Sequence, residues 1–333
     1  MISIAIQKDR VVQPGGQEQS FSTRWTELAS LAGVRAVPVD VYAPGVIEQI
    51  RQCDGFMWRY GYDEQSRRFA QVLLPAVERG LRLPVFPNWN TSWTFEDKVA
   101  QRYQLEAAAI PTPETWVFWK KEDAARFIKT ANYPFVLKLS AGIRSGNVAL
   151  VRNVDEASTW IDRLFGWGVN SLEPLNVGTR KSYGKHKGYF YAQAFLPDNN
   201  FDTRVTVIGR RAYAFRRFNR EGDFRASGGG NIDWTPSEID FETVRLAFKV
   251  AGALGTQSVA IDGMRRGSER VVGEVSYTYA AWAIEACPGH WRLNGAPATG
   301  SLEWVAGSLR AEDAIFEDFL REVQSRQVSR SAA

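Results

Sequence analysis

The sequence predicts an N-terminal parallel α/β domain followed by an α+β part that consists of two lobes. Two patterns support this fold class. The first 90 or so residues alternate short apolar runs with segments of helical periodicity, whereas the chain after residue 189 contains apolar runs joined in pairs by short turns. The length of 333 residues also fits two or three lobes better than one small core. We therefore divide the chain into residues 1–93, 94–188 and 189–333.

Residues 1–93 alternate strands and helices in the way that is typical of a small parallel sheet. The expected strands are short and apolar and cover residues 2–6, 35–39, 54–59 and 84–88. The expected helices cover residues 21–32, 46–52 and 69–80. Ligands of such folds gather at the carboxyl ends of the strands, where Trp58, Arg59 and Asn88 fall. For these three residues, ligand binding and plain packing or solvation are equally open.

Residues 94–188 begin with a helix signal, because Thr94 is a good N-cap residue and the acid Asp97 follows three positions later. The helix is expected over residues 97–109 and is stopped by Pro111. Further helices are expected over residues 122–131 and 155–165, with strands over 135–139 and 147–151. Residues 166–188 show no periodicity, and we expect them to form a mobile loop between the lobes.

Residues 189–333 are expected to form antiparallel strands with helices packed on them. The expected strands cover residues 189–196, 203–208, 212–218, 258–264 and 271–276. The second and third of these strands are joined across Gly209, and the last two also read as a hairpin. Helices are expected over residues 240–254 and 303–323.

The composition is that of an ordinary folded protein, with 44% apolar and 23% charged residues. The net charge is +4, and no block of lysine and arginine marks a nucleic-acid-binding arm. We therefore favour a mildly basic enzyme surface over nucleic-acid binding, and no membrane span is expected. The two cysteines, Cys53 and Cys287, permit one disulfide, although reduced and buried thiols in a cytoplasmic protein are favoured. The two histidines belong to no cluster, so a zinc site is not expected.

A glycine loop follows the strand that ends at Lys138. Small side chains and free backbone N–H groups in such a loop bind phosphate oxygens. The residues that offer them are Ser140, Gly142, Ser145 and Gly146. The spacing is neither that of a Walker P-loop nor that of a dinucleotide-binding turn. Because Lys138 lies in an otherwise apolar strand, its charge needs a partner, and we favour a nucleotide phosphate over a structural carboxylate.

Two carboxylates, Asp262 and Glu274, each lie within an apolar strand of one expected hairpin. Twelve residues apart, they can face each other, and two such carboxylates repel unless a cation lies between them. Oxygen ligands of this kind suit Mg²⁺, which also takes phosphate oxygens from a nucleotide. The alternative is that each carboxylate meets an arginine. Together with the glycine loop, the metal is the favoured interpretation.

These motifs, in this order and spacing, resemble the ATP-grasp superfamily, and within it the glutathione-synthetase-like and ribosomal-protein-glutamate-ligase-like carboxylate–amine ligases. The resemblance covers about residues 90–290, and the preceding domain has the position of a pre-ATP-grasp domain. The segments that carry it, besides the glycine loop and the Asp262–Ser276 region, are 95–99, 111–113, 134–138, 191–196, 201–205, 214–218 and 223–230. Two departures stand out: Ala194 where an acid is common, and Ser276 where asparagine is usual.

The resemblance implies a role for each matching residue. Lys98 and Lys138 would hold the ATP phosphates, with the glycine loop closing over them, and Asp202 would meet the ribose. The adenine edge would be read by Gln193, Ala194, Phe195 and Leu196. Charge on the reacting groups would be stabilised by Arg204, Arg217 and Arg225. The magnesium ligands would be Asp262, Glu274 and Ser276. Apart from the resemblance, a lone histidine such as His290 could be a base, although a structural role is favoured.

The implied activity is that of a ligase that uses ATP and Mg²⁺ to activate a carboxylate as an acyl phosphate and joins it to an amine. Its partners would be a small-molecule or peptide carboxylate and an amine, without nucleic acid or membrane, and a homo-oligomer is possible. The rivals are an ATP-grasp phosphotransferase, a non-catalytic nucleotide-binding module and a nucleic-acid-binding protein. Intact Lys138, Asp262 and Glu274 argue against the second rival, and the even spread of charge argues against the third.

Overall fold

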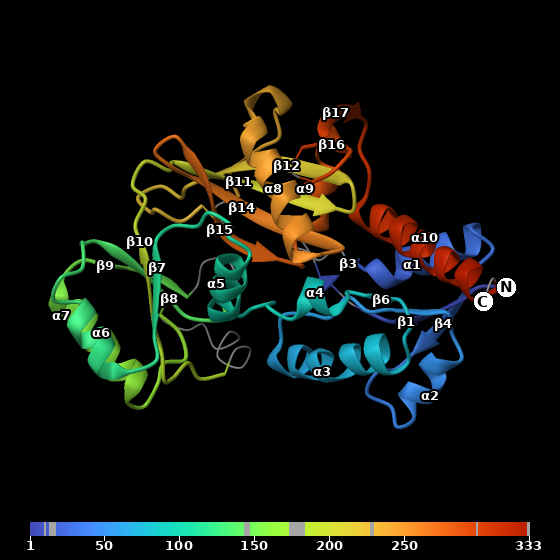
Figure 1. The fold of residues 1–333 in the computed structure, drawn as a ribbon, viewed down its shortest axis with the longest axis horizontal. Coiled ribbons are helices and arrows are strands. Elements are labelled where there is room, and N and C mark those ends of the chain that lie inside the picture. Colours follow the sequence, from blue (N-terminus) through green and yellow to red (C-terminus); the bar gives the residue numbers. More distant parts are fainter. Residues whose placement is uncertain are drawn as a thin grey trace.

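The computed structural model describes residues 1–9, 11–12, 18–142, 147–172, 184–226, 230–297 and 299–331. In this part of the chain, three sheets of four, four and seven strands follow one another in the sequence, and a short two-stranded hairpin adds to the first domain. In Figure 1 the first domain lies at the lower right, the central sheet at the left and the large sheet above them. The mixture of a parallel sheet and two antiparallel sheets confirms the predicted fold class.

The first domain is a parallel sheet of order β4-β1-β5-β6. The strands are β1 (Ser3–Gln7), β4 (Arg35–Val39), β5 (Gly55–Met57) and β6 (Val85–Phe86). The helices are α1 (Phe21–Leu31), α2 (Val46–Arg51), α3 (Glu64–Pro75), the π-helical turn η1 (Ala76–Gly80) and α4 (Trp89–Ser92). The separate hairpin pairs β2 (Val11–Val12) with β3 (Glu18–Gln19). The strand–helix alternation predicted from the sequence is confirmed; β4 has the predicted bounds, β1 is shifted by one residue, and β5 and β6 are shorter than predicted.

Side-chain caps fix the helix starts. Ser20 caps α1 by accepting from the Thr23 N–H, and Asp63 caps α3 in the same way. The helix predicted to be capped by Thr94 is α5 (Lys98–Ala107), and Asp97 caps it by accepting from the N–H groups of Val99 and Ala100. The prediction from Thr94 was therefore three residues early. This matters for function because the cap makes Lys98 the first helical residue.

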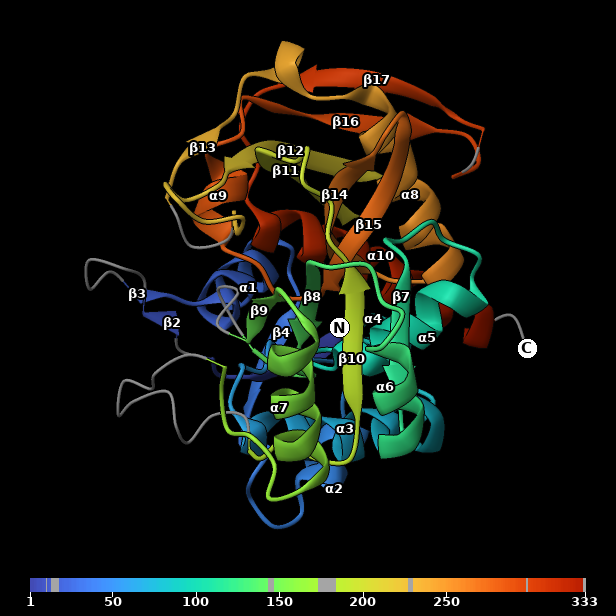
Figure 2. The ribbon, with the colours of Figure 1, turned by 90° about the vertical axis from the view of Figure 1, so that its left-hand side faces the viewer.

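The central sheet is antiparallel, with the order β7-β10-β8-β9. Its strands are β7 (Thr115–Phe118), β8 (Phe135–Lys138), β9 (Val148–Val151) and β10 (Phe190–Ala194). Two helices, α6 (Lys121–Phe127) and α7 (Val154–Phe165), cover its outer face (Figure 2). The sequence missed β7, and the boundary placed at residue 189 falls just before a strand of this sheet. The reason is that β10 returns to pair with both β7 and β8.

The large sheet has the order β15-β14-β11-β12-β16-β17, with β13 beside β12. Its strands are β11 (Phe201–Ile208), β12 (Arg211–Phe218), β13 (Ile232–Asp233), β14 (Ser258–Arg266), β15 (Glu269–Ser276), β16 (Gly289–Asn294) and β17 (Ser301–Ala306). Its helices are the 3₁₀ turn η2 (Pro236–Glu238), α8 (Phe241–Leu254), α9 (Ala281–Glu285) and α10 (Ala311–Ser331). The two predicted hairpins are confirmed.

The segment 303–323 is not one helix. Residues Ser301–Ala306 form β17, which pairs with the unpredicted β16 so that Trp304 lies opposite Trp291, and the helix α10 begins only at Ala311. The two indole rings meet edge to face with 4.7 Å between their centroids. Pairing with the preceding strand β16 thus overrides the local helical pattern.

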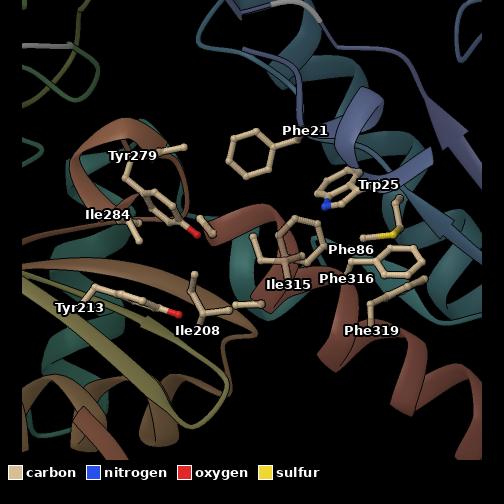
Figure 3. Packing of buried hydrophobic residues seen from close by; sticks show 14 of the residues in the cluster. Phe21, Trp25, Phe86, Ile208, Tyr213, Tyr279, Ile284, Ile315, Phe316 and Phe319 are labelled. Carbon is tan, nitrogen blue, oxygen red and sulfur yellow. The ribbon is translucent and has the colours of Figure 1, made fainter. Parts of the chain in front are cut away.

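One hydrophobic cluster joins the two ends of the chain. It combines α1, α9, α10 and the large sheet, and Figure 3 shows Trp25, Phe86, Ile315, Phe316 and Phe319 in it. The indole of Trp25 is fully buried, and its N–H donates to the backbone oxygen of Glu312 at 3.1 Å. The helix α10 therefore packs with the first domain, beside α1 (Figure 1).

Both cysteines, Cys53 and Cys287, are buried free thiols, as predicted. In the described part of the chain, no helix combines the length and the apolar character that a membrane crossing requires.

Candidate active site

A cavity of about 940 Å³ lies where the three parts of the chain meet. Its walls carry side chains from the first domain, the central sheet and the large sheet. Of the predicted site residues, it is lined by Lys138, Gly142, Gln193, Ala194, Phe195, Leu196, Asp202, Arg204, Arg217, Arg225, Asp262, Glu274 and Ser276. Residues that are up to 138 positions apart in the sequence (Lys138 and Ser276) are thus brought to one cavity, where a ligand would contact all three parts of the chain.

The strand register explains why the acids and arginines face the same way. Asp262 on β14 lies directly opposite Glu274 on β15 and, on its other side, opposite Arg204 on β11. Asp202 lies two residues before Arg204 and opposite Arg217 on β12. Because residues opposite each other, and residues two apart, share one face of a sheet, all five side chains point to the cavity side. A bulge follows Asp262, a feature that often re-aims side chains beside active sites.

The two arginines and two aspartates form a buried network. Arg204 donates to both carboxylate oxygens of Asp262 at 2.8 and 2.9 Å. Arg217 donates to both oxygens of Asp202 at 2.7 and 2.6 Å and also lies 2.7 Å from Asp262. Burial alone would raise the pKa of Asp262, but Arg204 and Arg217 outweigh it and hold that pKa well below its usual range. Asp262 therefore meets two arginines, which is the alternative that the sequence analysis considered for it. Asp202 also has an arginine partner, Arg217.

Burial has the opposite result at Asp202, where it raises the pKa despite the charge of Arg217. Both oxygens of Asp202 accept from one guanidinium, which fixes the Arg217 side chain in the plane of that pair. The role predicted for Asp202, contact with a ribose, stays a prediction. The contact that the structure does give Asp202 is with Arg217.

Lys98 and Glu274 meet across the boundary between α5 and β15. The Lys98 ammonium nitrogen lies 3.2 Å from Glu274 Oε1 and 3.4 Å from the backbone oxygen of Gly142. Burial would lower the pKa of Lys98, but the charges of Glu274 and Glu96 more than offset it and raise the pKa to about 12. Lys98 is thus a buried cation that does not itself line the cavity but pairs with Glu274, which does.

Lys138 lies at the end of β8 and donates to the backbone oxygen of Gly273 at 3.4 Å. Burial lowers its pKa to about 8, and the charge of Glu274 offsets this only in part. No carboxylate within ion-pair distance of Lys138 is found in the described residues. Lys138 is half-buried at the end of this strand, and among the described residues the structural carboxylate considered as its partner is not found.

The start of the glycine loop is held by the protein itself. The N–H of Ser140 donates to the Tyr189 hydroxyl at 2.7 Å, and the N–H of Gly142 donates to Glu96 at 2.8 Å. A side chain on Gly142 would have its Cβ only 2.7 Å from that of Asn147, so this close approach requires glycine. Ser145 and Gly146, which were also predicted to bind phosphate, lie outside the described residues, as do Ile143 and Arg144.

The segment predicted to read the adenine edge runs along the cavity at the end of β10. The backbone N–H of Ala194 donates to the backbone oxygen of Glu114 at 2.8 Å, and this bond fixes the end of the strand. The side chain of Gln193 is buried and donates to the Thr115 hydroxyl at 2.9 Å. Ala194 ends the strand, Phe195 and Leu196 follow it, and all three residues line the cavity.

Several other predicted residues have identifiable partners. Arg225 donates to both oxygens of Asp223 at 3.0 and 2.8 Å, at the edge of the cavity. The hydroxyl of Ser276 donates to the backbone oxygen of Thr278 at 2.9 Å. His290 is buried against Tyr213, with 5.4 Å between the ring centroids, and it does not line the cavity. Its position fits the structural role rather than that of a base.

Of the three residues at the strand ends of the first domain, only Arg59 lines the cavity. Trp58 is buried in an aromatic cluster with Tyr60 and Phe69, and Asn88 caps α4 by accepting from the Thr91 N–H. For these two, packing and capping are the observed roles.

The sequence missed Glu96, which is buried beside Lys98 and has a positive φ of 55°. Its burial raises its pKa, with the charge of Lys98 opposing. The signal that could have found it is a second acid next to the Asp97 cap. It also missed Phe21, which lines the cavity from α1, because nothing local marks this residue and α1 lies far from the motifs. Tyr279 lies in a segment whose aromatic residues suggested either an acceptor pocket or core packing, and it lines the cavity.

The donor set fits one magnesium ion shared with a nucleotide. Mg²⁺ is usually bound by one or two carboxylates together with phosphate oxygens and waters, and Asp262 and Glu274 offer two carboxylates opposite each other on the cavity side. The described residues contain no group of three or more His, Cys, Asp and Glu side chains that would form an all-protein metal cage. Such a cage is not needed where a nucleotide supplies further oxygens.

The fold and the cavity are those of an ATP-grasp protein, in which two antiparallel lobes enclose one site. Residues 95–285, which are 191 of the 333 residues, match the family described as "RimK-like ATP-grasp domain". The chain belongs to this family, and the resemblance recognised in the sequence is confirmed.

Three similar proteins illustrate the relationship. The α-aminoadipate–LysW ligase LysX of Saccharolobus solfataricus is 29% identical over 180 residues, which are 54% of this chain and 60% of LysX. The match therefore spans less than two thirds of that relative. A RimK domain ATP-grasp protein from Sphaerobacter thermophilus is 21% identical, with a TM-score of 0.52 over 82% of this chain and 89% of that chain. The ATP-grasp ligase PsnB, complexed with minimal precursor, Mg and ADP, is 13% identical, with a TM-score of 0.56 over 97% and 98% of the two chains. At these identities the two solved structures show a shared fold.

Proposed function

We propose that this protein is an ATP- and Mg²⁺-dependent ligase that joins a carboxylate to an amine. The observation that carries the proposal is that Lys138, Asp262 and Glu274 line one cavity, with Lys98 paired to Glu274 at its edge. Membership of the RimK-like ATP-grasp family supports it. So do the ligase name of LysX and the Mg and ADP found with PsnB, although each of these describes the relative.

The proposed reaction has two steps. In the first, a carboxylate oxygen of the donor forms a bond to the γ-phosphorus of ATP while the bond to the β-phosphate oxygen breaks, which gives an acyl phosphate and ADP. In the second, the amine nitrogen attacks the acyl carbon and loses a proton, and inorganic phosphate leaves with its bonding electron pair. A bound magnesium ion would neutralise phosphate charge and orient the phosphates.

The residues of the chain are proposed to act as follows. Lys98 and Lys138 bind phosphate oxygens, and Asp262 and Glu274 supply the carboxylate ligands of the metal, with Ser276 as a weaker neutral ligand. Arg217 and Arg204 stabilise negative charge on the acyl group and on the tetrahedral intermediate, because their guanidinium groups already lie beside the metal ligands. Asp202 holds Arg217 in position.

We also propose contacts for the adenine, for the phosphates and for the substrate. The backbone of Ala194, Phe195 and Leu196, beside Gln193, lies along the adenine, and Gly142 opens the loop that covers the phosphates. Arg225 stabilises charge from the substrate side. The substrates themselves are a small-molecule or peptide carboxylate and an amine.

The test is a two-substrate assay. Purified protein is incubated with ATP, Mg²⁺ and pairs drawn from a set of carboxylic acids and amines, and ADP and phosphate are measured together with the product mass. Release of phosphate that requires both the acid and the amine supports the ligase. A phosphorylated product that needs no amine would support a phosphotransferase, and ADP binding without turnover for any pair would support a non-catalytic module.

An isotope experiment checks the acyl phosphate. With the donor carboxylate labelled with oxygen-18, one labelled oxygen is expected in each phosphate released, because the carboxylate oxygen that attacks phosphorus leaves with it. Unlabelled phosphate would contradict the first step.

A further inference from the structure

Arg59 is a buried cation at the end of the cavity that faces the first domain. It follows β5 by two residues, and 8% of its surface is exposed. Its guanidinium lies over the ring of Phe21, with 4.5 Å to the ring centroid, and one N–H donates to the backbone oxygen of Tyr279 at 3.2 Å. Phe21 and Tyr279 belong to the cluster drawn in Figure 3, and both line the cavity together with Arg59. Three segments therefore hold this side chain at the cavity wall.

The partners of Arg59 differ from those of the other cavity arginines. Arg204, Arg217 and Arg225 each donate to a carboxylate at 3.0 Å or less. For Arg59, the described residues provide no carboxylate within ion-pair distance, and its contacts are one aromatic face and one carbonyl oxygen. A guanidinium has five N–H donors in a planar fork that matches a carboxylate. A buried charge with so few acceptors is costly unless an anion completes it.

The location of Arg59 relates it to the reacting centre. Tyr279 follows the proposed metal ligand Ser276 by three residues, which span at most about 10 Å of extended chain. The carbonyl of Tyr279, and with it the Arg59 guanidinium, is thus one small molecule's length from the metal side of the cavity. The centre itself already has Arg204 and Arg217 beside Asp262. Arg59 is therefore suited to a second, separate negative group on the substrate.

We propose that Arg59 binds a substrate carboxylate that the reaction leaves unchanged. On this proposal, which rests on the ligase function proposed above, one of the two substrates carries a free carboxylate beyond the groups that react. That substrate is an amino acid whose amine is the acceptor, or a dicarboxylic acid of which one carboxylate is activated. Arg59 then determines specificity, because replacing the charged group by a neutral one leaves the buried guanidinium without its partner.

The test compares acids with their amides. The full-length protein is assayed with ATP and Mg²⁺ for phosphate release, using the proteinogenic L-amino acids and their α-carboxamides as acceptors, and glutarate and its monoamide as donors. We expect wild-type protein to prefer the acid by about 100-fold or more in kcat/KM in one of the two arms. The arm that shows the preference identifies which substrate carries the carboxylate. Equal use of acid and amide in both arms would overturn the proposal without any variant.

The variant Arg59→Gln is expected to lose this preference while the KM for ATP changes by less than about threefold. Arg59→Lys, which keeps the charge but not the fork, is expected to keep part of the preference. The matched control is Arg79→Gln, since Arg79 also lies over an aromatic ring, that of Trp89 at 5.6 Å, but outside the cavity. A folded Arg59→Gln protein with the wild-type preference would overturn the proposal.

A binding experiment separates this proposal from the ligase function. If no pair of substrates releases phosphate, the ligase proposal fails, and the thermal midpoint with ADP and Mg²⁺ is measured with added glutarate and with each L-amino acid. At least one of these anions is expected to raise the midpoint of the wild type and of Arg79→Gln but not that of Arg59→Gln. Failure of all of them to stabilise the wild type, or equal stabilisation of all three proteins, would overturn the role of Arg59.

Discussion

The ammonium nitrogen of Lys98 lies 3.2 Å from the carboxylate of Glu274, which joins the first turn of α5 to the strand β15. The pair connects the residue proposed to bind phosphate with the residue proposed to bind magnesium. Since phosphate and metal carry opposite charges, a metal–nucleotide complex offers each member of the pair a partner of the right sign. The two residues are therefore expected to respond together to nucleotide binding.

Replacing Glu274 by Gln is expected to lower kcat by about 100-fold or more, because a neutral amide is a poor magnesium ligand and metal stabilisation amounts to several kcal/mol. Far-ultraviolet circular dichroism is expected to stay unchanged. The matched control is Glu269→Gln in the same hairpin, where the side chain is exposed and pairs with Arg266. Full activity of Glu274→Gln would refute its role at the metal.

Nucleotide affinity is expected to decrease above pH 8. Burial lowers the pKa of Lys138 to about 8, so the free protein loses this cation as the pH rises through that value. Because phosphate binds the protonated form, affinity should be flat below the pKa and fall by up to about tenfold per pH unit above it. Isothermal titration with ADP and Mg²⁺ between about pH 7 and 9.5 measures this. In Lys138→Arg the charge persists, and the decrease should disappear.

Replacing Asp202 by Asn distinguishes its two possible roles. If Asp202 positions Arg217, as its two hydrogen bonds indicate, kcat should fall by about 10- to 100-fold with little change in nucleotide affinity. If Asp202 instead binds the ribose, the affinity for ADP should weaken and kcat should change less. Steady-state kinetics and ADP titration on the same preparation decide between the two, and a weakened affinity alone would contradict the positioning role.

Replacing Trp25 by Ala is expected to destabilise the fold by about 3–5 kcal/mol, the usual cost of truncating a buried aromatic side chain. Trp25 is fully buried, meets Phe21 and Phe86 edge to face and donates to the Glu312 oxygen. The shift of the urea midpoint measures the loss. Leu31→Ala on the same helix, where the side chain is 80% exposed, should change stability by less than about 0.5 kcal/mol.

The elements whose partners lie nearby in the sequence were predictable. The hairpin that places Asp262 opposite Glu274 needs only a short turn, and the α/β alternation of the first domain is a local pattern. Lys138 and the start of the glycine loop were found in the same way. In these cases the chemistry follows from residue type and spacing alone.

The parts that escaped prediction depend on long-range pairing. Arg204 meets Asp262 because β11 lies beside β14, 58 positions further along, and nothing local determines that neighbour. Strand β7 forms because β10, from a distant part of the chain, pairs with it. Strand β17 was missed although its partner β16 directly precedes it, because its residues follow a helical pattern. Glu96 joins the site through a positive φ beside the helix cap, and a sequence does not display such a backbone conformation.

The packing of α10 against α1 has a practical consequence for dissecting the molecule. Ending translation before Ala311 would leave the indole of Trp25 without the carbonyl it binds and would uncover the aromatic layer around it. A separately expressed amino-terminal fragment should accordingly aggregate. Adding the last helix in trans, as a synthetic peptide, should rescue it.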